Sequence, residues 1–548
     1  MKILLKHNPT TNQLIFIYLI FILPLFFTST VSLAALGPQL IKDINPDGRS
    51  DIYSLSAGNG RLFFSAKDET NIRQIWTSDG TAAGTVQMTD IDSSIYGIQL
   101  SYKIYLAVNN IYYFHLRRWS DNEYELWRSD GTVAGTFKLI DLPDVIDSGI
   151  RTVGAGGLYY FVPWSDKVYG RELWVSDGSV SGTRMVKDIN PGTYSSSPHN
   201  LIKVNNKLYF LSANDLWTSD GTSAGTKLVA NFEEGRYDDM RSISNVNGII
   251  YLSYLNNSGY ELWRHDSNSG QTVIVKNFSG LRSESTAYAA VGDILYFVAK
   301  GINSDAFDLW KSDGSPGGTV MVRNIGETNA SYTDWHLTNV DGTLFFKAND
   351  GTHGWELWKS DGTASGTFML KDINDTSYSS KLNCFTAVGD TLFFIYEKTS
   401  YVKTLWMSDG TEAGTIETNM GVDNLKCPVN FNGQLYFYGA DRTTKDYSTE
   451  LYRYNLSSNI PAAPEVKVSA NGTRVNISWH VMPNSDGYTL SYAPYPFTGP
   501  ETIASVELGN VSSLSAELWS GAAFYIVVQS SNSGALSGYS NVELFIIK

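Results

Sequence analysis

The chain has 548 residues and a formal net charge of −14 at neutral pH, and 42% of its residues are hydrophobic. This length is too great for one ordinary compact core and indicates several units or a repeat array, while the hydrophobic content excludes a broadly disordered chain. The acidic balance argues against nucleic acid and anionic membrane surfaces as partners, because both require a basic face.

The first 34 residues have the composition of a secretory signal peptide. Lys2 and Lys6 give a positive start, residues 14–27 form an apolar core, and residues 32–34 provide a small-residue cleavage site. No later stretch is long and apolar enough to span a membrane. We expect residues 1–34 to be removed, with no membrane insertion afterwards, and the mature protein to reach the extracellular space, the cell surface or the periplasm. An uncleaved N-terminal anchor is the alternative.

Residues 38–456 repeat one pattern. Each copy has an apolar run, a tight turn, a strand such as LYF, then ELW, SDGTxxGT and a run such as MVKDI. The tryptophans lie roughly 43 to 51 residues apart, and Tyr452 takes their place in a ninth, worn copy. The structural anchors of the repeat are Trp76, Trp127, Trp174, Trp217, Trp263, Trp310, Trp358 and Trp406.

Each copy contains four strand-like runs, such as Trp335–Val340, Thr343–Ala348, Glu356–Ser360 and Thr367–Ile373. Four short antiparallel strands in a unit of about 45 residues predict a blade of a β-propeller. Leu40–Ile44 reads as an outer strand without the three that should precede it, and the last copy lacks an outer strand. We predict an all-β fold with about nine four-stranded blades, one of them shared between the two ends of the repeat region so that the ring closes; eight blades is the alternative.

The repeated side chains are interpreted as structural. A tryptophan fills the wedge between twisted sheets, and Asp-Gly forms a tight turn in which glycine accepts a positive φ. The segment Asp43–Asp51 resembles a calcium loop, but the equivalent segments that begin at Asp188 and Asp372 lack the ligand spacing. We therefore expect no cofactor and no metal, with calcium at Asp43–Asp51 as the alternative.

The two cysteines, Cys384 and Cys427, occupy equivalent positions in consecutive copies. Each precedes the first leucine of its LFF or LYF strand, Leu392 or Leu435, by the same number of residues. Stacked repeats would bring the two together, and an oxidising compartment would allow a disulfide. The alternative is a pair of small buried hydrophobic residues.

The repeat resembles that of a family of bacterial secreted proteins with ELWxxDGT repeats. Glu125–Thr136 (ELWRSDGTVAGT) and Glu356–Thr367 (ELWKSDGTASGT) carry the whole signature, and KDINPG follows the third copy. The resemblance covers roughly residues 38–455, although the fifth copy loses the Gly-Thr of the turn. It implies a propeller-like array in an exported protein, and it supplies no catalytic residues.

A second domain follows a linker at residues 457–463. Residues 464–548 alternate apolar and polar positions, as half-buried strands do. This segment resembles a fibronectin type III domain, because Trp479 stands where that family has its core tryptophan and residues 518–524 are similar to its Leu-x-Pro-Gly-x-x-Tyr motif. Phe524 replaces the corner tyrosine of the family. The resemblance implies a small β-sandwich.

No catalytic residue is predicted. The chain lacks HExxH, GxSxG, CxxC and P-loop patterns, and none of its seven histidines pairs at metal spacing. The loops before ELW and after KDI vary between copies and are rich in aromatic residues, which suits recognition of sugar rings or extended peptide; aromatic residues that only cover blade edges are the alternative. The predicted ligand-binding residues are Trp119, Tyr124, Trp164, Tyr169, Tyr194, Tyr237, Trp335, Trp355 and Tyr378.

The features above predict an exported, monomeric, non-enzymatic binding or adhesion protein whose partner is an extracellular polysaccharide or protein. One alternative is a polysaccharide-binding or polysaccharide-degrading protein, which converging carboxylates in a central channel would favour. The other is a structural surface scaffold, which would self-associate.

Overall fold

The computed structural model describes residues 2–7, 14–16, 38–58, 60–92, 94, 96–97, 106–121, 123–142, 152–163, 168–232, 239–256, 259–279, 288–300, 307–327, 335–374, 379–399, 402–418, 422–423, 425–441, 448–454, 464, 466–479, 485, 487–495, 504–532, 535–536 and 540–547. The chain divides into two compact units. The repeat unit comprises Pro38–Gly410 and Glu417–Tyr454, and the terminal unit comprises Met1–Gly37, Thr411–Ile416 and Asn455–Lys548. The regular elements of the described residues are all β-strands, which confirms the all-β prediction. No described segment forms a helix with the length and apolar character needed to cross a membrane.

Each repeat forms one antiparallel sheet. Sheet 1 consists of β4 (Tyr53–Gly58), β5 (Arg61–Lys67), β6 (Arg73–Ser78) and β7 (Val86–Gln87). Sheet 2 consists of β8 (Tyr96–Gly97), β9 (Leu106–Val108), β10 (Ile111–Arg118), β11 (Tyr124–Ser129) and β12 (Phe137–Leu142). Sheet 3 consists of β13 (Thr152–Ala155), β14 (Leu158–Phe161), β15 (Leu173–Ser176) and β16 (Arg184–Lys187), and sheet 4 of β17 (His199–Val204), β18 (Lys207–Ser212), β19 (Asp215–Ser219) and β20 (Lys227–Ala230).

The same order continues through the later repeats. Sheet 5 consists of β21 (Asp239–Val246), β22 (Ile249–Asn256), β23 (Gly259–Asp266) and β24 (Thr272–Ser279). Sheet 6 consists of β25 (Tyr288–Val291), β26 (Ile294–Lys300), β27 (Phe307–Ser312) and β28 (Val320–Glu327). Sheet 7 consists of β29 (Thr338–Val340), β30 (Thr343–Asn349), β31 (Trp355–Ser360) and β32 (Phe368–Lys371), and sheet 8 of β33 (Leu382–Val388), β34 (Thr391–Glu397), β35 (Lys403–Ser408) and β36 (Ile416–Glu417).

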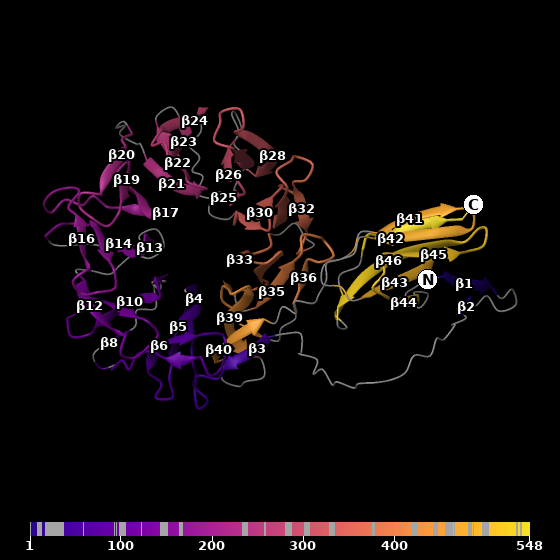
Figure 1. Ribbon diagram of the computed structural model, residues 1–548, viewed down its shortest axis with the longest axis horizontal. Coiled ribbons are helices and arrows are strands. Elements are labelled where there is room, and N and C mark those ends of the chain that lie inside the picture. The colour runs from indigo at the N-terminus through magenta and orange to yellow at the C-terminus, as the bar shows by residue number, and fades with distance from the viewer. Residues whose placement is uncertain are drawn as a thin grey trace. The chain divides into compact units, whose positions relative to one another are not determined.

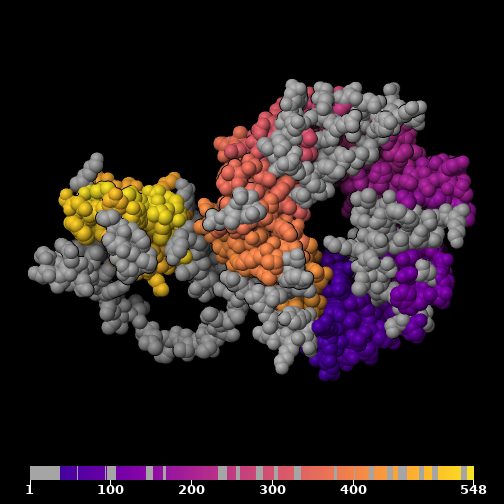
Figure 2. Space-filling view, turned by 180° about the vertical axis from the view of Figure 1, so that it is seen from behind, coloured from indigo at the N-terminus to yellow at the C-terminus, as the bar shows by residue number. Residues whose placement is uncertain are grey.

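Sheet 9 combines the two ends of the repeat region. It consists of β37 (Val422–Asp423), β38 (Val429–Phe431), β39 (Gln434–Asp441), β40 (Thr449–Tyr454) and β3 (Pro38–Lys42). Strand β3 pairs antiparallel with β40, and Leu40 lies opposite Tyr452. In Figure 2 the indigo residues at the start of this unit accordingly lie against the orange residues at its end.

Neighbouring sheets contact one another through their first strands. Contacts join β4 to β9, β9 to β13 and each later first strand to the next, and β38 of sheet 9 contacts β4 of sheet 1. In Figure 1 strands β4, β13, β17, β21, β25 and β33 lie toward the centre of the repeat unit, whereas β12, β16, β20, β24, β28 and β32 lie toward its outside.

The hydrophobic cores lie between consecutive sheets. Phe63 of β5 stacks on Tyr112 of β10 with ring centroids 4.0 Å apart, and Tyr113 stacks on Tyr159 of sheet 3 at 4.3 Å. Successive side chains of a strand point to opposite faces, so β10 buries both of its faces against neighbouring sheets. This double burial explains why the second strand of each repeat reads as a continuous apolar run rather than an alternating one.

A recurrent irregularity places the tryptophan in sheets 2 to 7. The pairing between the third and fourth strands shifts register between the leucine and the tryptophan of ELW, as at Leu126/Trp127 and Leu173/Trp174. Such a bulge bends the third strand and increases its twist. The tryptophan packs on a phenylalanine of the second strand of its own sheet, as Trp406 stacks on Phe394 with ring centroids 6.2 Å apart.

The terminal unit contains two packed sheets. One consists of β41 (Val466–Asn471), β42 (Arg474–Trp479) and β45 (Ser513–Glu517), extended by β1 (Lys2–His7) and β2 (Leu14–Phe16), and β1 runs parallel to β45. The other consists of β43 (Gly487–Pro494), β44 (Ala504–Gly509), β46 (Ala523–Asn532), β47 (Ala535–Leu536) and β48 (Glu543–Ile546). Trp479 and Phe524 lie in the buried core, and Trp479 contacts Tyr488 at a centroid distance of 5.3 Å.

Candidate functional site

The SDGT turn, in the repeats that carry it, is a closed hydrogen-bonded unit. In sheet 3, Asp177 accepts hydrogen bonds from the amide and the hydroxyl of Ser179, at 2.8 and 2.7 Å, and the Ser179 hydroxyl holds the pKa of Asp177 below its usual value. The Ser176 hydroxyl bonds the Thr183 hydroxyl at 2.7 Å. A Cβ on Gly182 would lie 2.0 Å from the Asp177 carboxylate, so a larger residue there would displace that carboxylate. These polar groups are used within the turn and belong to the scaffold.

The glutamate of ELW holds the segment that connects its sheet to the next sheet. Glu356 is fully buried and accepts hydrogen bonds from the amides of Ile373 at 2.8 Å and Ser380 at 3.2 Å. Burial raises the pKa of Glu356 to about 7, against the lowering effect of those donors. Glu172 holds Ile189 and Ser196 in the same way. The buried acid is therefore a structural clamp, because it satisfies backbone donors that the crossing leaves unpaired.

The lysine of KDI joins one sheet to the next. Lys187 donates to the carbonyl of Thr226 at 3.1 Å, and its ammonium lies 5.9 Å from the ring centroid of Trp217. Lys276 repeats this contact with Thr319 and Trp310, at 2.9 and 5.6 Å. Each lysine thus caps the turn of the next sheet and covers its tryptophan. The same pairing is made by Lys42 with Thr85 and Trp76, and by Arg323 with Thr367 and Trp358.

Sheet 1 lacks this lysine. Thr89 occupies its position, four residues after Thr85 as Lys187 is after Thr183. The Thr89 hydroxyl turns into its own sheet, where it accepts from the Ile75 amide and donates to Gln74 Oε1, both at 2.9 Å. Thr89 consequently does not reach the next sheet as a lysine would.

A pocket of about 270 Å³ lies at this junction. We call it the Thr89 pocket. Sheet 1 and the residues after it contribute Met88, Thr89, Asp90, Ile91 and Asp92. Sheet 2 contributes Leu116, Trp127, Val133 and Thr136. Its wall therefore contains the tryptophan and the turn threonine that a lysine contacts at other junctions, and the exposed residues Asp90 and Asp92 add negative charge.

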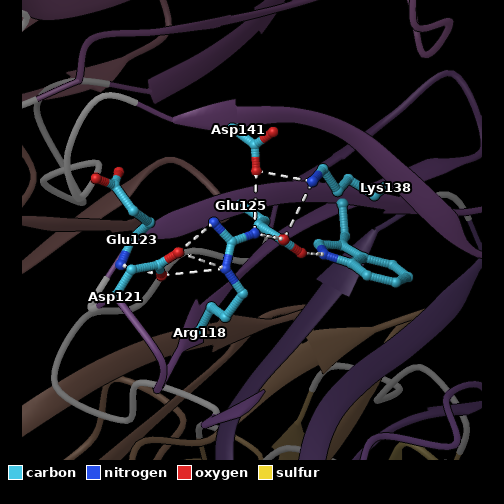
Figure 3. Close-up of polar contacts among 7 residues, drawn as sticks. Arg118, Asp121, Glu123, Glu125, Lys138 and Asp141 are labelled. Atoms are coloured by element: carbon cyan, nitrogen blue, oxygen red, sulfur yellow. Dashed lines mark hydrogen bonds and ion pairs between the residues drawn. The ribbon is translucent and has the colours of Figure 1, made fainter. Parts of the chain in front are cut away.

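A charged network borders the same tryptophan (Figure 3). Glu125 of β11 is almost fully buried and accepts from Trp127 Nε1 at 2.9 Å, Arg118 at 2.6 Å and Lys138 at 3.1 Å. Arg118 also pairs with Asp121 at 2.8 Å, and Lys138 with Asp141 at 2.7 Å. Hydrogen bonds to these cations hold the pKa values of the two aspartates low. The network fixes the edge of Trp127 and neutralises both cations.

The structure separates the predicted ligand-binding aromatics. Trp119, Tyr169 and Tyr194 are exposed, and the segments of the latter two meet where Ser195 accepts from the Arg171 amide at 3.0 Å. Tyr124 and Trp355 are half-buried. Trp164, Tyr237 and Tyr378 lie outside the described residues.

Trp335 is fully buried, and the expectation of an exposed binding residue there is wrong. Its ring stacks on Phe346 at 6.2 Å and meets Trp355 edge-on at 5.8 Å. Trp335 precedes β29, which begins only at Thr338, after His336 with its positive φ. Trp335 therefore belongs to the core between sheets 6 and 7.

The two cysteines, the calcium-like segment and one loop histidine also make structural contacts. Cys384 and Cys427 form a disulfide between sheets 8 and 9, with Cα atoms 5.1 Å apart. In the calcium-like segment, Asp51 pairs with Lys67 at 2.8 Å. No group of three or more His, Cys, Asp or Glu within the described ranges could hold a metal ion. His353 pairs with Asp350 at 2.8 Å, which raises its pKa.

Sequence reasoning missed the Thr89 pocket and the network around Glu125. The signal for the pocket was present, because threonine replaces the lysine of KDI in the first full repeat. Its meaning depends on knowing that this lysine contacts the next sheet. The network had no comparable signal, since Arg118 and Lys138 are not repeat positions.

No protein-family profile matches the chain, and no curated protein matches it. Among solved structures, the chain is similar to puromycin hydrolase (15% identity, 64% of this chain and 59% of that chain covered, TM-score 0.32). It is also similar to oligopeptidase B from Leishmania major (8% identity, 79% and 54% covered, TM-score 0.39). The β-propeller domain of the Trilobed protease from Pyrococcus furiosus matches at 12% identity, with 70% of this chain and 99% of that chain covered and a TM-score of 0.28.

These neighbours contradict the expected non-enzymatic adhesion protein. By their names, these three structures are a hydrolase, an oligopeptidase and a protease. The chain spans 59% of puromycin hydrolase and 54% of oligopeptidase B. At these identities and TM-scores the likeness supplies no catalytic residue.

Proposed function

We propose that the repeat unit is a closed nine-bladed β-propeller, and that residues 464–548 form a fibronectin type III sandwich. The pairing of β3 with β40 and the contact of β38 with β4 support closure, since the first adds the start of the repeat region to sheet 9 and the second joins sheet 9 to sheet 1. The buried Trp479 supports the sandwich assignment. We also propose that residues 1–34 direct export.

We propose further that the propeller recognises a protein partner outside the cytoplasm through the Thr89 pocket. The pocket itself carries this proposal. Its volume of about 270 Å³ lies below the usual range of small-molecule sites, roughly 300–1,000 Å³, and suits a single side chain of a polypeptide. Apolar walls from Ile91 and Leu116 would accept the stem of that side chain. The proposal concerns recognition and assigns no catalytic residue.

Charge favours a basic segment as the partner. Asp90 and Asp92 lie at the pocket, and the whole chain carries a net charge of −14. Complementary charge speeds encounter and disfavours acidic partners. The cations nearby do not oppose this attraction, because Arg118 and Lys138 are each paired with carboxylates.

A peptide-binding screen tests the proposal. Purified mature protein is titrated into fluorescent peptides of equal length that carry basic, neutral or acidic side chains, with polarisation as the readout. We expect saturable binding of basic peptides, weakened by Asp90→Asn together with Asp92→Asn, while Asp293→Asn on the turn between β25 and β26 serves as the matched control. Equal binding of acidic peptides, or no peptide binding at all, would remove this function.

A further inference from the structure

We infer that the Thr89 pocket takes the side-chain cation of a lysine or arginine from the partner, in the position that the chain's own lysines occupy at other junctions. This inference rests on the proposed function and specifies the ligand group. The ammonium or guanidinium would donate to the carbonyl of Thr136 and lie against Trp127.

The chain itself shows how a cation fits such a junction. At three junctions a lysine donates to a turn threonine and lies 5.6 to 5.9 Å from a tryptophan centroid. At a fourth, Arg323 donates to the carbonyl of Thr367 and lies 5.9 Å from the ring of Trp358. A cation over an indole face with a carbonyl acceptor is thus the repeated solution of this fold.

The acceptor side of this arrangement is retained at the pocket. Trp127 and Thr136 both line it, and the Ser129–Thr136 hydroxyl bond at 2.7 Å keeps the turn in the geometry of the other repeats. Within the described residues, no lysine or arginine donates to the Thr136 carbonyl. Thr89 supplies no cation, and its hydroxyl is bonded to Ile75 and Gln74.

Other junctions without the lysine are filled differently. Ile140 takes the lysine's position before sheet 3 and packs into the core beside Trp174. Ala230 takes it before sheet 5, where Phe232 meets the ring of Trp263 edge-on at 5.2 Å. Thr89 supplies no comparable apolar group, so the junction between sheets 1 and 2 keeps its pocket.

The first test uses the full mature chain and four versions of one peptide. A Gly/Ser-rich peptide carries a single lysine, arginine, norleucine or acetyl-lysine at its centre. We expect lysine and arginine peptides to bind about tenfold or more tightly than the norleucine and acetyl-lysine peptides, which keep the stem and lose the charge. Equal affinity for norleucine would overturn the inference.

The second test introduces a lysine at position 89, where other repeats of the chain have one. Thr89→Lys should place an ammonium on the Thr136 carbonyl, as Lys187 does on Thr226, and should reduce lysine-peptide binding by about tenfold or more. Val180→Lys adds the same charge at an exposed turn of sheet 3 and should leave binding unchanged. Unchanged binding by Thr89→Lys with a wild-type melting temperature would overturn the inference. If Thr89→Lys does not fold, the peptide series alone decides.

A free amine distinguishes the source of the cation. Butylamine should compete only at concentrations far above those of the lysine peptide, since a polypeptide adds further contacts. Competition at equal concentration would show that the pocket binds free amines. It would refute the protein partner but support a cation as the ligand. If peptide affinity changes neither with the central residue nor with Thr89→Lys, the cation site is refuted. The proposed function, recognition of a polypeptide, is then still supported.

Discussion

Lys187 joins two sheets by placing its ammonium 5.9 Å from the ring centroid of Trp217. The same ammonium donates to the Thr226 carbonyl at 3.1 Å. Two elements of the repeat, the lysine of KDI and the tryptophan of ELW, therefore meet across a junction rather than within one sheet. We interpret the recurrence of the lysine and the tryptophan as a consequence of each sheet packing against a neighbouring sheet on both of its faces.

Replacing Lys187 with alanine should weaken this junction. The change removes a charged hydrogen bond and a cation–π contact, and we expect a loss of about 1–2 kcal/mol in stability. The measurement is the shift in the thermal unfolding midpoint. Lys203→Ala, on the exposed side of β17, provides the comparison and should shift the midpoint little. Equal effects of the two substitutions would show that the Lys187 contacts contribute nothing.

Much of this architecture could be predicted from the sequence. Strand order, the shared sheet of β3 and β40 and the turn role of Asp-Gly follow from short-range patterns that every copy repeats. Side chains that act across sheets could not be predicted. Trp335 lies in a variable segment and reads as a loop aromatic, yet Phe346 and Trp355 bury it. In the sequence, Thr89 is simply a departure from the lysine of the repeat. Only the structure shows that it lines a pocket together with Trp127 and Thr136.

The two consecutive glycines of the sixth turn should respond differently to alanine. A Cβ on Gly318 would lie 2.1 Å from the carboxylate of Asp313, which accepts two bonds from Ser315 at 2.8 Å. Gly318→Ala must displace that carboxylate, and we expect it to cost about 1–2 kcal/mol. Gly317 has open space around its Cβ position, so Gly317→Ala should change stability by less than about 0.5 kcal/mol. Chemical denaturation of both variants makes the comparison, and a reversed order would refute the packing argument.

The disulfide between Cys384 and Cys427 should stabilise the last two sheets. The two residues are 43 positions apart, and closing a loop of that size in the unfolded chain is worth about 3–4 kcal/mol in the chain-entropy account. Serine at both positions should lower the unfolding midpoint of the oxidised protein. A reducing agent should lower the midpoint of the wild type and leave the double variant unchanged. A wild-type midpoint that the reductant leaves unchanged would contradict the assignment, and the double variant controls for other effects of the reductant because the chain has no other cysteines.

His115 should make the protein sensitive to acid. It is buried between sheets 2 and 3, and neither ring nitrogen has a hydrogen-bond partner among the described residues. Burial lowers its pKa from 6.5 to about 4. The unfolded chain therefore takes up a proton before the folded chain does, so stability is complete above pH 6.5 and falls as the pH drops toward 4. The loss amounts to about 3 kcal/mol at full protonation.

A substitution isolates this contribution of His115. Val162 and Val298 occupy the equivalent position in sheets 3 and 6, so His115→Val keeps a side chain that the fold accepts. We expect the variant to lose less stability than the wild type between pH 6.5 and pH 4, measured by urea unfolding at each pH. Leu211→Val changes the same position in sheet 4 without a titrating group and should lower stability equally at every pH. A wild-type slope that survives His115→Val would mean that the buried imidazole is not the source of the acid sensitivity.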